Sequence, residues 1–163
     1  MKKWLSLILC TLLLVTITAC NTIAEPNITV VAQISQLSDE EYGSVGTSGL
    51  ENPNKDDFRK FSLNFDAENL NGLKSRLIEI PNNWRNLINF DKDRYWYGSG
   101  EEQDNKDESF AHYKYEFVFY SNGLSDEDIR KAFDSAIITV SWVTKEGENA
   151  IIEYVIGDLI AFN

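Results

Sequence analysis

Few residues in this chain could act as nucleophiles or as histidine or cysteine metal ligands. The sequence has one histidine, His112, and two cysteines, Cys10 and Cys20, together with 26 acidic residues. Without a second histidine, multi-histidine zinc sites and Ser-His-Asp triads have little to build on. Two carboxylates could in principle hydrolyse a glycosidic bond, because that reaction needs only two carboxyl groups at the right separation. No spacing in the sequence selects such a pair, so we predict a protein that is not an enzyme and uses no cofactor.

The acidic segment 101–108 is where a cation site would be expected. Asp104, Lys106 and Glu108 alternate as the ligands of a calcium loop do, but a lysine fills one ligand position and Ser109 replaces the loop glycine. We therefore predict a solvated loop and no metal site. The sequence also lacks the phosphate-loop, Gly-x-Ser-x-Gly and dinucleotide-binding glycine motifs.

The N-terminal segment has the layout of a secretory signal peptide. Lys2 and Lys3 precede an apolar run, Trp4–Ile17, which ends in small residues. A membrane-spanning helix needs about 20 residues to cross a hydrocarbon layer of roughly 30 Å, whereas the run from Trp4 to Ala19 has sixteen. We therefore predict export and removal of this segment, in preference to a permanent transmembrane helix.

The end of the segment, Ile17-Thr18-Ala19-Cys20, resembles the lipobox of bacterial lipoproteins, in which an aliphatic residue and two small residues precede the lipidated cysteine. The resemblance implies that residues 1–19 are removed as a lipoprotein signal peptide and that a diacylglyceryl group is attached to Cys20. Acylated Cys20 would then hold the protein in the lipid bilayer, at the extracytoplasmic face of the cell membrane. Asn21 follows the cysteine, where Gram-negative family members that are retained at the inner membrane carry an aspartate. The sequence does not fix the type of cell envelope, and we expect a Gram-positive one. The alternative is ordinary secretion with cleavage after Ala24.

Charge and cysteine content narrow the classes of partner. The chain carries 15 basic and 26 acidic residues, and loss of Lys2 and Lys3 would take its net charge from −11 to −13. Such a charge repels phosphates and anionic lipid headgroups, so we predict no nucleic-acid partner. Cys10 would leave with the signal peptide and Cys20 would carry lipid. Without a cysteine left for a disulfide, the mature domain must be stabilised by its apolar core.

After a short tether at 20–27, residues 28–163 are predicted to form a single extracytoplasmic β-rich domain. Apolar and polar residues alternate in segments typical of half-buried strands, at 28–34, 61–65, 110–120, 138–142 and 152–156. Ser125 followed by Asp128 resembles a capping box and predicts one short helix near 126–134. The polar stretch 38–57 reads as a long loop. This pattern favours a mostly β fold, an antiparallel β-sandwich of immunoglobulin-like form. A barrel or a helix-on-sheet arrangement stays open.

A candidate binding surface is the aromatic cluster Tyr95, Trp96 and Tyr97, with Trp84 nearby in the sequence. Neighbouring residues on a strand point to opposite faces, so either Trp96 or the two tyrosines should face out. Exposed aromatic residues beside Gly98 and its neighbours could contact a glycan or a protein, although ordinary packing within a sheet is the alternative.

These observations predict a membrane-anchored extracytoplasmic lipoprotein with a binding or accessory role, whose partner is a protein or an envelope glycan. Two alternatives are an enzyme that uses carboxylates on cell-wall glycan and a protective or regulatory lipoprotein that masks a membrane partner.

Overall fold

The computed structural model describes residues 25–163. The predictions that concern Cys10, the signal peptide and the Cys20 lipobox therefore lie outside the described residues. Within 25–163, no helix is both long and apolar enough to cross a membrane.

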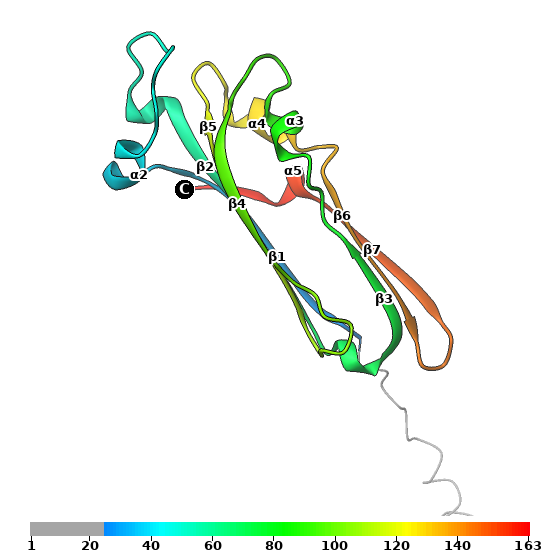
Figure 1. The fold of residues 1–163 in the computed structure, drawn as a ribbon. Coiled ribbons are helices and arrows are strands. Elements are labelled where there is room, and N and C mark those ends of the chain that lie inside the picture. The colour runs from blue at the N-terminus through cyan, green and yellow to red at the C-terminus, as the bar shows by residue number, and fades with distance from the viewer. Residues whose placement is uncertain (1–24) are drawn as a thin grey trace, which may run out of the picture.

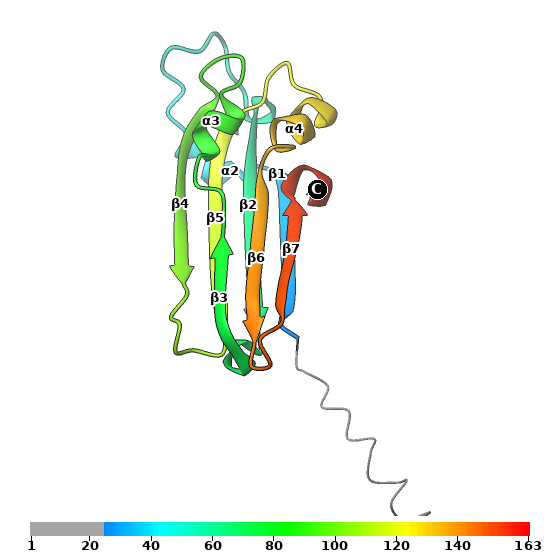
Figure 2. The same cartoon turned by 90° about the vertical axis from the view of Figure 1, so that its right-hand side faces the viewer.

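The described chain is mostly β, as predicted, and forms two sheets (Figures 1 and 2). The larger sheet has the order β4-β5-β2-β1-β8, and its strands are β1 (Asn27–Gln36), β2 (Phe58–Glu68), β4 (Tyr95–Gln103), β5 (Ala111–Tyr120) and β8 (Ile160–Phe162). The smaller sheet has the order β3-β6-β7, and its strands are β3 (Leu73–Glu79), β6 (Ile137–Thr144) and β7 (Asn149–Val155). All neighbouring strands are antiparallel except β1 and β8, which run parallel.

The helices of residues 25–163 are short. They are α2 (Asp39–Gly43), α3 (Trp84–Ile88), α4 (Asp126–Ala132) and α5 (Ile156–Leu159), with 3-10 turns at Lys55–Asp57 and Leu70–Gly72. The predicted helix near 126–134 is present as α4, but the prediction of a single helix is wrong. In the polar stretch 38–57, Ser38 and Glu41 form a capping box that starts α2.

The predicted solvated loop 101–108 begins later than expected, because β4 continues to Gln103. Gly98 and Gly100 do not end this strand; they lie opposite Phe117 and Tyr115 of β5. A Cβ added at Gly100 would come within 2.7 Å of the Tyr115 ring. Glycine therefore allows the two strands to stay paired under a large aromatic side chain.

The two sheets form two layers (Figure 1). Their inner faces share one apolar cluster. The larger sheet contributes Phe61, Leu63, Phe65 and Phe117, and the smaller sheet Ile138, Val140 and Trp142. Ile129 and Phe133, in and just after α4, close the cluster at one end.

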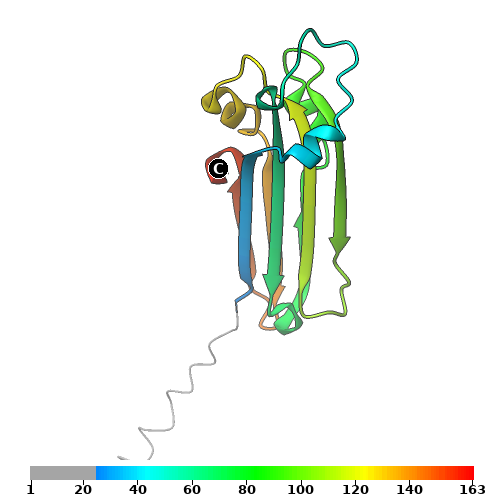
Figure 3. The same ribbon diagram turned by 90° about the vertical axis from the view of Figure 1, so that its left-hand side faces the viewer.

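A second, smaller cluster lies on the outer face of the larger sheet and holds the 38–57 segment. Its buried members are Leu37, Val45, Phe58 and Val118, with Tyr42 and Trp96 packed against them. Figure 3 shows α2 crossing this face. The segment predicted as a loop is thus docked onto the sheet by its own apolar residues.

The long axis of the strands gives the molecule two distinct ends. β1 begins at Asn27, at the end that also carries the Leu70–Gly72 turn and the turn between β6 and β7 (Figures 1 and 2). We call this the Asn27 end. α3 and α4 lie at the opposite end.

Candidate functional site

The four aromatic residues predicted as a binding surface are separated in the structure. Trp84 is 7% exposed and packs in the core against Phe61 and Tyr115, with ring centroids 5.4 Å away in each case. Tyr95 also faces inward, 5.3 Å from the ring of Phe117. Trp84 is thus a core residue, and Tyr95 is a half-buried residue packed against the same core.

A β-bulge decides where Trp96 and Tyr97 point. The pairing with β5 shifts between Tyr95 and Tyr97, which leaves Trp96 as an extra residue. The expected strict alternation therefore fails: Trp96 packs on the outer cluster, 5.5 Å from Phe58, and Tyr97 also lies on the outer face with 42% exposure. Of the predicted set, only Tyr97 is freely exposed.

Tyr97 lines a shallow groove of about 240 Å³ beneath α2, together with Glu41, Lys60 and Glu116. The Glu41 carboxylate accepts hydrogen bonds from Lys60 Nζ at 2.5 Å and from the Ser38 backbone N–H at 2.8 Å. The Lys60 bond, followed by the Ser38 bond, lowers the pKa of Glu41 to about 2. One wall of this groove is therefore a fixed, ionised pair.

Two tyrosines and two carboxylates meet along β4 and β5. Tyr113 Oη donates to Asp104 at 2.9 Å, and Tyr115 Oη donates to Glu102. Arg76 of β3 also binds Asp104, at 2.5 Å. Burial, and next the hydrogen bond to the carboxylate, raises the pKa of each tyrosine well above its ordinary value. Both tyrosines therefore stay protonated and act as hydrogen-bond donors. Because Asp104 binds both Tyr113 of the larger sheet and Arg76 of the smaller sheet, this cluster links the two sheets.

The residues considered above for metal binding do not come together in the part of the chain that the structure describes. His112 Nδ1 lies 2.8 Å from Asp66 Oδ1 across two paired strands on the outer face. Asp104, considered above for calcium, is bound by Arg76. Among residues 25–163, no group of three or more His, Cys, Asp or Glu residues could hold a metal ion.

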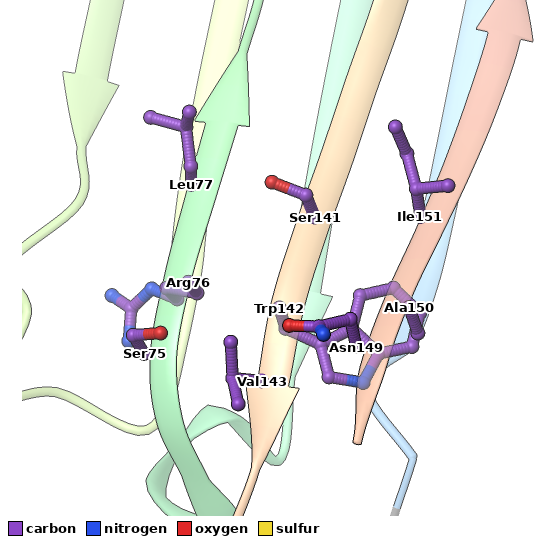
Figure 4. Close-up of a pocket in the computed structure, with 9 residues that line it drawn as sticks. All are labelled: Ser75, Arg76, Leu77, Ser141, Trp142, Val143, Asn149, Ala150 and Ile151. Atoms are coloured by element: carbon purple, nitrogen blue, oxygen red, sulfur yellow. The ribbon is translucent and has the colours of Figure 1, made fainter. Parts of the chain in front are cut away.

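The outer face of the smaller sheet carries a different feature, a shallow groove of about 370 Å³ (Figure 4). Leu77 of β3, Ser141 of β6 and Ile151 of β7 form one row across the three strands. Leu77 is 55% exposed and Ile151 63%, while Ser141 between them is small. The groove thus has two aliphatic walls and a polar floor. We call it the β6 groove.

Acidic and further apolar residues border the β6 groove. The next row along the strands is Glu79, Thr139 and Glu153. Beyond it Ile137, 40% exposed, pairs with Val155. The outer face of the larger sheet instead carries ion pairs such as Lys60–Glu41 and Lys114–Glu116. Exposed aliphatic residues clustered on one face are typical of an interaction surface.

The sequence pattern did not single out Leu77 or Ile151. The alternating segment 152–156 places Ile152 and Tyr154 on one face of the strand and Ile151 on the other, without marking Ile151 as unusual. The one available signal was the adjacent pair Ile151-Ile152 on a strand that otherwise alternates.

Comparison with protein-family models, with curated proteins and with solved structures found no significant match to this chain.

Proposed function

We propose that this protein is a membrane-anchored extracytoplasmic lipoprotein with a binding role and no catalysis of its own, and that it binds a protein partner through the β6 groove. We also propose that its two sheets form an antiparallel β-sandwich of immunoglobulin-like form. The shared core of the two inner faces supports this class, whereas the parallel pairing of β1 with β8 is a departure from purely antiparallel sheets.

The observation that carries the proposal is the exposure of Leu77 and Ile151 on either side of Ser141. Two large aliphatic side chains exposed by more than half cost free energy in water, and a partner's apolar side chain seated over Ser141 would remove that cost. Glu79 and Glu153 flank Thr139 in the next row. Charge complementarity therefore favours a partner with an aliphatic side chain beside a lysine or arginine.

The position of the β6 groove fits a partner at the membrane. The groove includes Val143 and Asn149, next to the turn between β6 and β7, and this turn lies at the Asn27 end. The lipobox cysteine, Cys20, precedes Asn27 by seven residues, a span of roughly 25 Å at most. A lipid at Cys20 would hold the groove close to the bilayer surface.

A second candidate function is binding of an envelope glycan at the groove beneath α2. Tyr97 offers an exposed ring, and Glu116 and the Glu41–Lys60 pair offer acceptors and a donor for sugar hydroxyls. Substitution of Tyr97 by alanine should abolish retention on cell-wall glycan if this alternative holds.

The proposal is tested by placing a photo-crosslinking amino acid at Ser141 in the full-length, membrane-anchored protein. The matched control places it at Ser62, on the outer face of the larger sheet. We expect a covalent adduct with one protein from Ser141 only, and loss of this adduct in the Leu77→Asp variant. Equal labelling from both positions, or an adduct insensitive to Leu77→Asp, would contradict the proposal.

A further inference from the structure

One edge of β7 has no strand beside it, because β7 ends the order β3-β6-β7 (Figure 2). An unpaired edge exposes a row of backbone N–H and C=O groups that can pair with another strand. Proteins usually protect such edges by shortening them, bulging them or placing lysine or proline on them.

Each of the other edge strands of the described chain is bulged, shifted in register or very short, whereas β7 has none of these features and its one charged residue is Glu153. β4 carries the bulge at Trp96, β3 has a register shift between Leu73 and Ser75, and β8 has only 3 residues. β7 has 7 residues, contains no proline, lysine or arginine, and pairs with β6 in one unbroken register. Its adjacent Ile151 and Ile152 are 63% and 39% exposed.

The backbone bonds at the two ends of β7 show which residues point their N–H groups outward. Thr144 N–H donates to Glu148 O at 2.9 Å, and Ile156 N–H donates to Ala136 O at 2.9 Å. Both pairs share the register of the whole hairpin, in which hydrogen-bonded and non-hydrogen-bonded pairs alternate. Ile151 and Glu153 therefore occupy non-hydrogen-bonded pairs, and their N–H and C=O groups face the free edge.

We propose that an extended segment of the protein partner adds to β7 as an antiparallel strand. The inference rests on the proposed function, because Ile151 belongs both to this edge and to the wall of the β6 groove. A segment residue opposite Ile151 would be apolar, and the residue opposite Glu153 would be lysine or arginine. Backbone bonds supply affinity in this mode of recognition, and alternate side chains supply specificity.

Charge selects a foreign segment over a second copy of this chain. The described residues carry 13 basic and 26 acidic side chains, and Glu148 and Glu153 flank the centre of the edge. Pairing of β7 with its own copy would gather four glutamates along one seam between two molecules of charge −13, which is unfavourable. A segment with lysine and an aliphatic residue on one face has the complementary charge.

The probe for this inference is a nine-residue synthetic peptide in which valine and lysine alternate on one face and threonine occupies every other position. Two control peptides carry N-methyl groups, one on the valine and lysine amides and the other on the threonine amides. Residues opposite Ile151 and Glu153 point their N–H groups toward β7. We therefore expect methylation of the valine and lysine amides to weaken binding about tenfold or more, and methylation of the threonine amides to have little effect.

The matched protein variants are Glu153→Pro and Glu153→Ala. Both remove the carboxylate, but only proline removes the outward N–H, and proline is tolerated at such an edge position. Glu153→Pro should weaken peptide binding about tenfold more than Glu153→Ala, with both variants keeping the near-ultraviolet circular dichroism of the parent.

Several outcomes would overturn strand addition by a foreign segment. They are the absence of saturable binding of the unmodified peptide, equal effects of the two N-methylated peptides, and a dimer in solution that Glu153→Pro alone dissociates. The last result would make the occupant a second copy. Specific crosslinking from Ser141 that persists alongside any of these results would leave the proposed function standing, whereas its loss would remove the proposed function itself.

Discussion

Arg94 and Asp91 form a bidentate ion pair, with Nε 2.6 Å from Oδ1 and Nη2 2.7 Å from Oδ2. Arg94 Nη1 donates to the carbonyls of Tyr120 at 2.9 Å and Asn122 at 3.2 Å. The Arg94 side chain is only 3% exposed. This arginine therefore ties the start of β4 to the end of β5, and Asp91 supplies its counter-charge.

Substitution of Asp91 by asparagine should lower the free energy of unfolding by about 1–2 kcal/mol, because a buried guanidinium loses its ionic partner while the carboxylate itself is partly exposed. Urea unfolding measures the change. Asp93→Asn is the control, since Asp93 accepts only an exposed bond from Asn89 at 3.1 Å. Equal effects of the two substitutions would mean that the Arg94 pair adds nothing to stability.

The Glu41–Lys60 pair predicts a pH dependence. The folded pKa of Glu41 is about 2, below its ordinary value of 4.5. A lowered folded pKa contributes stability above pH 4.5 that is lost as the pH falls toward 2. Glu41→Gln should therefore lower stability at pH 7, by less than about 1 kcal/mol for a partly exposed pair. The difference in melting temperature from the parent should shrink between pH 5 and pH 2; a constant difference would contradict the assignment.

The capping box of α4 gives a prediction about helix stability. Ser125 Oγ accepts from the Asp128 N–H at 3.2 Å, and Asp128 Oδ2 accepts from the Ser125 N–H at 3.0 Å. Ser125→Ala should cost about 1 kcal/mol in thermal or urea unfolding. Ser135→Ala, at an exposed position beyond α4, should change the midpoint little. An unchanged midpoint for Ser125→Ala would show that the cap does not stabilise the domain.

The close approach of β4 to β5 at Gly100 predicts that a larger residue at this position destabilises the domain. A Cβ at this position would come within 2.7 Å of the Tyr115 ring, which is buried and hydrogen-bonded. Gly100→Ala should destabilise the domain by about 1–3 kcal/mol through overpacking. Gly46→Ala is the control, because no atom lies within 4 Å of the added Cβ. If both variants unfold at the same denaturant concentration, Tyr115 must move aside at little cost.

The lipobox predicts that Cys20→Ala releases the protein from the membrane. Loss of the acylation site removes the chains whose burial provides anchoring, at about 0.8 kcal/mol per CH₂. Detergent phase partitioning and metabolic lipid labelling measure the change. Cys10→Ala, within the proposed signal peptide, should leave both measurements as in the parent. Retention of label in Cys20→Ala would exclude lipidation at this residue.

The extent to which the sequence predicted the structure differs between elements. β5 and α4 were predictable because each has a local signal: strict alternation from Ala111 to Phe119 in one case and the Ser125 cap in the other. Alternation also tells which residues share a face, but not which face another sheet covers. The β6 groove was therefore missed, because Leu77 and Ile151 have the same residue types as core residues and differ only in that no second sheet covers them.

The aromatic cluster shows a second limit. One extra residue at Trp96 changes the face of every residue before or after it, and a bulge leaves no local signal in a run of aromatic residues. The pairing of β8 with β1 was equally hidden, because residues 160–162 and 32–34 are brought together only by the complete fold.

That pairing has a consequence for the order of assembly. Ile160–Phe162 bonds to Ala32–Ile34, so the larger sheet joins nearly the first and the last residues of the described chain. Contacts between such distant segments form late, because the loop that separates them must close first. We therefore expect Ile160–Phe162 to be the last strand of the larger sheet to pair, because it must join β1 across most of the described chain.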